Sequence, residues 1–284
     1  MFADDTQFWT DVNLDDPLDV SRKVETMQET FSRVHVWMRR NKLKLNTDKT
    51  EFLLITPKSR RKEIPKVELN LCGTCVEPSQ HARNLGVYFD SNMSSTHNIS
   101  SVIKSCYVSL RNISSIRSYL TQEATEILIH AFITSRLDFC NSLFVGLPKI
   151  ALSRLQKIHN CAAKVISRKS KYDHVTPILK QLHWLPVEAR IQFKILMFVH
   201  KCIYKVAPNY LFAVIQQREF IRNTRLSRYI TLIEPRTKGK TYSNRAFGVA
   251  GPNLWNSLPF SIREIQDFNV YKATLKTYLF SKFF

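Results

Sequence analysis

Apolar residues recur at helical spacing over much of the chain. The first stripe steps alternately by four and three residues and consists of Val20, Val24, Met27, Phe31, Val34 and Met38. Asp16 and Pro17 stand just before it, as an N-cap residue and a proline at the first helical position. The pattern therefore predicts one amphipathic helix that ends near Asn41.

The same helical pattern returns at Ser94 and continues almost to the last residue. Thr121 is placed to cap a helix, and Pro148, Pro186 and Pro208 each stand where a further helix would start. Residues 268–280 form the last amphipathic pattern. Between these helices, Gly251-Pro252-Asn253 is typical of a turn.

Strand patterns are short and confined to the first third of the chain. Residues 51–56 predict a short buried strand, and two further strands are expected at about 66–71 and 84–89, on either side of a turn that holds Cys72 and Cys75. Only 6 glycines occur, so few positions adopt left-handed conformations easily. The expected fold class is α+β and mainly α-helical.

Charge is distributed unevenly. The net charge is +19, and the first 20 residues contain six aspartates with no Lys or Arg, so the remaining 264 residues carry +25. A basic body of this size indicates a polyanionic partner. An anionic membrane is the competing partner, but no basic amphipathic helix lies beside a lipidation motif, and no apolar run is long enough to span a bilayer.

Six cysteines are spread widely, and four of them lie on helical patterns, which is typical of an intracellular, reducing compartment. Cys72 and Cys75 form a CxxC motif, but no second pair stands at a fitting distance. We therefore expect no zinc site. The first residues also lack the basic segment and apolar core of a signal peptide.

Four sequence blocks occur in a characteristic order. They are FADD (Phe2–Asp5), NKLKLNTDKTEFLLI (residues 41–55), RNLGVYFD (Arg83–Asp90) and LHWLP (residues 182–186). In this order they resemble the palm and the following region of a reverse transcriptase from a non-LTR, LINE-type retrotransposon of the jockey-like or chicken-repeat-like group. SRLDFCNSLFVGLP, LQKIHNCAAKVIS, RIQFKI and WNSLPFSIR resemble later segments of such elements.

The resemblance implies RNA-directed DNA polymerase chemistry with Mg²⁺. Asp4 would be a metal ligand, Asp5 would share or support that role, and two ions would activate the primer 3′-hydroxyl and stabilise the leaving pyrophosphate. Lys49 would be the proton donor to pyrophosphate, and Leu85-Gly86 would form the primer grip. Taken alone, Asp4-Asp5 is equally typical of a solvated turn or a helix cap, Lys49 of an exposed lysine beside a turn, and Gly86 of a simple strand glycine.

The family's palm has a third metal-binding aspartate on a strand well before the ADD box, and its fingers also precede that box. Neither is found in these 284 residues. We therefore expect a fragment that is inactive alone. The expected regions are a partial palm (residues 1–92), a helical thumb-like region (93–170) and a basic C-terminal helical region (171–284).

Three groups of cations are candidate contacts for an RNA template and a DNA primer or target. The first lies in a basic loop and comprises Lys58, Arg60, Arg61 and Lys62. The second follows the outer face of the helix after Pro148 and comprises Lys149, Arg154, Lys157, Lys164 and Arg168. The third lies in a polar segment and comprises Arg222, Arg225 and Arg228.

Each group also has a simpler interpretation, because charge runs are often only solvated surface or linker. The basic loop would also suit a nuclear-import patch. Three functional hypotheses therefore stay open: a polymerase remnant, a non-catalytic nucleic-acid-binding module, or an inert translated relic. An expressed product would belong to a nuclear or cytoplasmic ribonucleoprotein.

Overall fold

A computed structural model describes residues 6–46, 49–57, 67–71, 73–218, 230–237 and 242–284. The chain divides into two compact units, residues 1–97 and 98–284. Each unit is described separately below. Both contain helices and only the first contains paired strands among the described residues, which confirms the expected α+β, mainly helical class.

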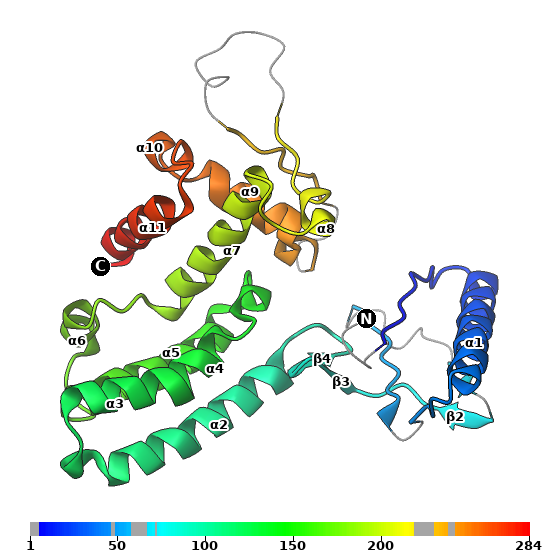
Figure 1. Cartoon of the computed structure of the whole chain (residues 1–284), viewed down its shortest axis with the longest axis horizontal. Coiled ribbons are helices and arrows are strands. Elements are labelled where there is room, and N and C mark those ends of the chain that lie inside the picture. The colour runs from blue at the N-terminus through cyan, green and yellow to red at the C-terminus, as the bar shows by residue number, and fades with distance from the viewer. Residues whose placement is uncertain (1–5, 47–48, 58–66, 72, 219–229, 238–241) are drawn as a thin grey trace. The chain divides into compact units, whose positions relative to one another are not determined.

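The first unit contains one long helix and two small antiparallel hairpins (Figure 1). Its elements are α1 (Pro17–Arg40), β1 (Leu69–Leu71), β2 (Thr74–Val76), β3 (His81–Asn84) and β4 (Val87–Asp90). Helix α1 begins as predicted, because the Asp16 side chain accepts a hydrogen bond from the Leu18 N–H at 3.0 Å. Nearby, the Asn13 N–H and the Arg22 guanidinium lower the pKa of Asp19.

The strand predictions for this unit were partly wrong. Residues 84–89 are not one strand, because Asn84 pairs with Val87 across a two-residue turn, Leu85-Gly86. Both turn residues have positive φ, at 45° and 85°, which a continuous strand does not allow. Residues 51–56 also form no strand: Phe52 makes one isolated bridge to Pro78, and only Thr56 is buried.

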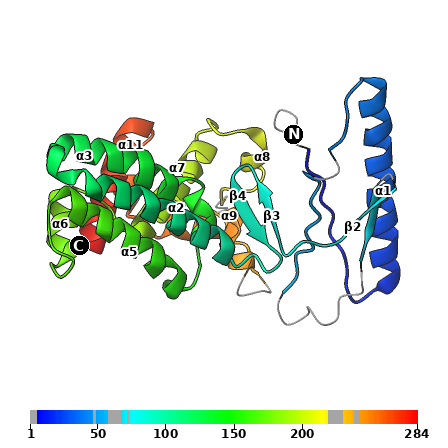
Figure 2. The ribbon, with the colours of Figure 1, turned by 90° about the horizontal axis from the view of Figure 1, so that it is seen from below.

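The second unit is helical in its described residues, and Figure 2 shows α5 beside α2. Its α-helices are α2 (Thr96–Ser115), α3 (Gln122–Ile129), α4 (Ser135–Asp138), α5 (Lys149–Ile166), α6 (Val175–Gln181), α7 (Val187–Ile203), α8 (Asn209–Phe212), α9 (Phe247–Asn256), α10 (Phe260–Arg263) and α11 (Phe268–Phe283). A π-helical segment, His130–Thr134, joins α3 to α4. Short 3-10 turns lie at Arg117–Tyr119, Asn141–Phe144 and Ser243–Arg245.

The predicted helix starts in this unit are correct. The Thr121 hydroxyl accepts a hydrogen bond from the Ala124 N–H, and α5, α7 and α8 each follow a proline. The predicted turn at residues 251–253 was wrong, because Pro252 lies inside α9. Glycine there serves close packing instead: a Cβ on Gly251 would lie 2.9 Å from the Val199 side chain.

Helix α7 lies at the centre of the second unit and packs against α5, α9 and α11. Nine of its 17 residues are buried. Trp255 and Tyr271 are fully buried beside it, with the Tyr271 ring stacked on His200 at 4.1 Å between centroids. The residues on both sides of position 170 thus share one hydrophobic core.

An extended segment at residues 230–234 is held against α9. The indole of Trp255 donates to the Ile230 carbonyl, and the Asn256 side chain both accepts from the Leu232 N–H and donates to the Leu232 carbonyl. Leu232 is also paired antiparallel with Gln217. Gln217 and Leu232 are therefore held next to each other.

Candidate nucleic-acid interface

The tip of the β3–β4 hairpin carries the predicted primer-grip residues. Leu85 is half-exposed there although it is a large apolar residue in a left-handed conformation, which is costly for a residue with a Cβ. Gly86 adopts its positive φ without this cost. The tip therefore places an apolar side chain and a bare backbone next to each other at the surface.

Two hydrogen bonds join Gln7 and Glu51 to this end of the hairpin. The Asn84 amide donates to the Gln7 side chain at 2.8 Å, and the Arg83 N–H donates to the Glu51 carboxylate at 2.9 Å. Gln7 follows Asp5 by two residues, and Glu51 follows Lys49 by two. Three segments that are far apart in sequence thus meet at one hairpin end within the first unit.

Lys49 itself is exposed, and its N–H bonds Asn46. Asp4, Asp5 and the basic-loop residues Lys58, Arg60, Arg61 and Lys62 lie outside the described residues, as do Arg222, Arg225 and Arg228. Within the described ranges, no three His, Cys, Asp or Glu side chains are grouped to hold a metal ion.

The five cations predicted on the face of α5 divide into two kinds. Lys149 and Lys157 are exposed. Arg154 donates to the Ser100 hydroxyl of α2 at 3.1 Å, and the Lys164 ammonium donates to the Lys171 carbonyl at 2.7 Å. These last two side chains therefore stabilise the fold as well as contributing charge.

Arg168 lies past the end of α5 with a φ of 50° and donates to the carbonyls of Arg117 and Leu120. The neighbouring Arg117 guanidinium donates to the carbonyls of Val165 and Ile166, the last turn of α5, at 2.9 and 2.7 Å. Burial lowers the pKa of Arg117. These two arginines serve to join the segment after α2 to the end of α5.

A second polar row, on α2 and with two cations, was missed by the sequence analysis. Lys104, Tyr107 and Arg111 follow Ser100 at steps of four, three and four, so they lie on one face of the helix. All three are exposed, Tyr107 by 47%. The helical spacing of this row is visible in the sequence, but only the contact between Ser100 and Arg154 places the row beside α5.

That contact makes the two rows neighbours. We call them the paired basic strips: Ser100, Lys104, Tyr107 and Arg111 on α2, and Arg154, Lys157, Cys161 and Lys164 on α5. The helices run in the same direction, because Arg154 joins their starts and Arg117 joins their ends. Figure 2 shows them side by side.

Neither α2 nor α5 contains an Asp or Glu, whereas together they carry six Lys and Arg. No ion pair within the described ranges involves either helix. No carboxylate on the two helices themselves offsets these cations, and unpaired surface cations of this kind attract polyanions. The strips are therefore the candidate interface of the second unit.

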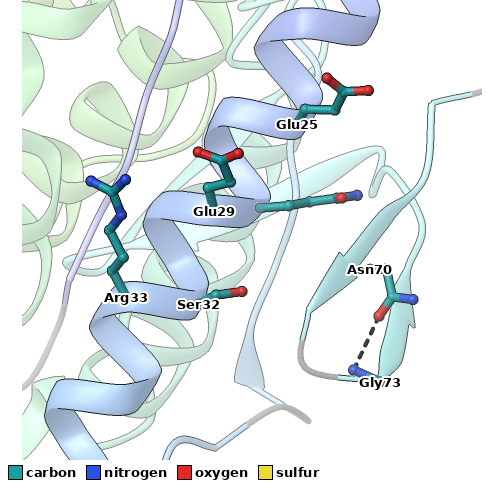
Figure 3. A pocket seen from close by; sticks show the side chains of 7 residues that line it. Glu25, Glu29, Ser32, Arg33, Asn70 and Gly73 are labelled. Carbon is teal, nitrogen blue, oxygen red and sulfur yellow. Dashed lines mark hydrogen bonds between the residues drawn. The ribbon is translucent and has the colours of Figure 1, made fainter.

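A hollow of about 750 Å³ beside α1 offers the opposite chemistry. Figure 3 shows Glu25 and Glu29 along α1 at its rim, with Asn70 and Gly73 of the first hairpin facing them. The Asn70 side chain accepts the Gly73 N–H at 3.0 Å and so closes the turn. Two carboxylates one helical turn apart repel phosphate, and only one cation, Arg33, stands beside them in the lining of the hollow.

Comparisons with known proteins add no relative. No protein-family model matches the chain, no curated protein is similar to it in sequence, and no solved structure matches its fold. Among the described helices, none combines the length and the apolar character that crossing a bilayer requires.

Proposed function

We propose that this chain is a segment of a non-LTR-type reverse transcriptase and that its own contribution is to hold a nucleic-acid duplex. The paired basic strips carry this proposal. Three exposed cations lie on two helices that contain no Asp or Glu. They are Lys104 and Arg111 on α2 and Lys157 on α5. Helices fixed together in this way can lie along a phosphate backbone, and such contacts bind every sequence about equally.

The reverse-transcriptase part of the proposal has separate support. The hairpin tip, Gln7 and Glu51 are in contact, and these are the neighbourhoods of the primer-grip block, the ADD box and the Lys-Thr block that the sequence resemblance assigns. A polymerase palm needs these blocks in one place. The assignment of Asp4, Asp5 and Mg²⁺ to catalysis stays a prediction.

Binding is tested with a 20-base-pair duplex DNA followed by fluorescence anisotropy over a range of salt. The parent chain should bind tightly at low salt, with a steep fall of log K against log salt. Exchanging Lys104, Arg111 and Lys157 for Gln should reduce that slope by roughly two to three units, since each phosphate contact contributes about 0.9.

A matched control removes the same charge elsewhere in the second unit. Lys272, Lys276 and Lys282 are exposed on α11, and their exchange for Gln should leave the slope within about one unit of the parent. Equal effects of the two triple variants would mean that net charge alone drives binding. Absence of binding by the parent would favour an inert relic over both polymerase and binding module.

Catalysis is tested separately by extension of oligo(dT) on poly(A) with Mg²⁺. We expect only background extension by the 284-residue chain and extension when an upstream palm segment of the same family is added. Extension by the chain alone that disappears in Asp4→Ala would contradict the expected inactivity.

A further inference from the structure

The outer face of the β3–β4 hairpin carries a second group of side chains suited to nucleic acid. His81, Arg83 and Tyr88 lie on one face, since Arg83 and Tyr88 are direct cross-strand partners and His81 is two residues before Arg83. His97, in the first turn of α2, completes the group. All four belong to the first unit, whereas the paired basic strips belong to the second.

Their rings form an ordered stack. The imidazoles of His81 and His97 are stacked at 4.1 Å between centroids and within 17° of parallel. Tyr88 meets His97 edge-on at 4.7 Å, and the Arg83 guanidinium lies 5.6 Å from the centre of the Tyr88 ring. We call these four residues the hairpin ring stack.

The stack is at the surface and not in a core. His81, Arg83 and His97 are exposed, and the buried side of the hairpin is formed instead by Val87. A group of rings that buries little area contributes little to folding. Flat π surfaces next to a guanidinium are, however, the combination that binds an unpaired base and its phosphate.

Two carboxylates close to this face, those of Glu51 and Asp90, are engaged with other groups, and Glu51 accepts the backbone N–H of Arg83. Asp90 is the cross-strand partner of His81, but its oxygens accept hydrogen bonds from the N–H groups of Asn92 and Ser94 and from the Ser94 hydroxyl. The Arg83 guanidinium forms no ion pair within the described ranges. Its charge is therefore available to a phosphate.

We propose that the hairpin ring stack binds single-stranded nucleic acid, with one unpaired base stacked on the imidazole pair and its phosphate at Arg83. This deepens the proposed function, on which it rests for the class of ligand, by adding a single-strand site in a different unit from the duplex-binding strips. Stacking accepts any base, so little sequence preference is expected.

The test uses the full chain and a single-stranded 10-mer with 2-aminopurine at its centre, whose fluorescence falls when the base stacks. The parent should quench it. His81→Leu removes the π face and should weaken binding at least about fivefold, while His81→Phe, which keeps a flat ring, should stay near the parent. Arg83→Gln should reduce the salt slope by about 0.7, the contribution of one phosphate on a single strand.

Circular dichroism should show the parent's helix content in all three variants, because the altered side chains are exposed. No quenching by the parent, or equal binding by His81→Leu and the parent, would overturn the proposal. Loss of quenching in His81→Phe would also overturn it, because the contact would then not be stacking. Quenching without any duplex binding would contradict the proposed duplex binding and support the single-strand site at the hairpin ring stack. Duplex binding without quenching would support the proposed duplex binding and overturn the single-strand site.

Discussion

Helices α1 and α7 both carry an apolar stripe, but 11 of the 17 residues of α7 are apolar against 9 of the 24 residues of α1, and the two helices differ in how much of each is buried. Helix α1 has 24 residues, of which only Asp19 and Val20 are buried, whereas nine of the 17 residues of α7 are buried. The apolar stripe of α1 is mostly half-buried against its own unit, whereas α7 contacts helices on several sides. The periodic stripe therefore predicts that a helix forms, whereas the apolar share of the helix indicates how firmly it is held.

The largest expected difference concerns core truncation. Ile158→Ala, at a fully buried position of α5, should lower the free energy of unfolding of the second unit by about 2–5 kcal/mol. Met27→Ala, at the half-buried stripe of α1, should cost about 1 kcal/mol or less. Amide hydrogen exchange resolves the two units. Comparable losses of protection in both variants would show that α1 is as firmly packed as the core.

Acid should affect the two units in different pH ranges. Burial lowers the pKa of His159 to about 3, with Arg190 and His130 adding to the effect, and its Nε2 has no partner in the described structure. The unfolded chain takes up this proton near pH 6.5, so the second unit loses stability as the pH falls below that value, by about 2 kcal/mol between pH 7 and 5.

The first unit has a different acid dependence. The lowered pKa of Asp19 stabilises the start of α1 above the ordinary aspartate range, and this contribution is lost only as the pH falls below about 4. Hydrogen exchange at pH 7, 6 and 5 should thus show weakening of the second unit first. His159→Leu should flatten its pH dependence. An unchanged slope in that variant would assign the effect to other groups.

The smallest expected effect concerns helix caps. Asp16→Ala and Thr121→Ala each remove one side-chain acceptor from a helix start and should cost about 1 kcal/mol. In α1 that loss should appear as faster exchange, because only two of its 24 residues, Asp19 and Val20 in the first turn, are buried. In α3 exchange should stay slow, since Thr125 and Ile129 are buried. Fast exchange in both helices would remove the contrast between the units.

Helix starts were predictable because their signals are local. Asp16, Thr121 and the prolines before α5 and α7 act within one turn of where they stand. Gly251 and Pro252 are also turn-forming residues, but both lie inside α9, where the Val199 side chain packs close to Gly251. That contact joins residues more than 50 positions apart, and single-sequence patterns contain no information on it.

The candidate interface was predictable only in part for the same reason. The cations of α5 were visible as a row, but the sequence did not reveal that Arg154 and Lys164 bond their own chain, or that Lys104 and Arg111 of α2 lie beside them. The ring stack depends on the register of β3 and β4 and on the position of His97. Neither follows from the spacing of the residues along the chain.

The pairing of Gln217 with Leu232 has a consequence for engineering the protein. The Arg218 N–H bonds the Thr231 carbonyl and the Ile233 N–H bonds the Gln216 carbonyl, so the two ends of the intervening stretch are fixed next to each other. Lengthening a closed loop costs only about 0.6 kcal/mol for each doubling of its length. A reporter peptide inserted between positions 218 and 231 is therefore expected to leave the pairing of Gln217 with Leu232 in place.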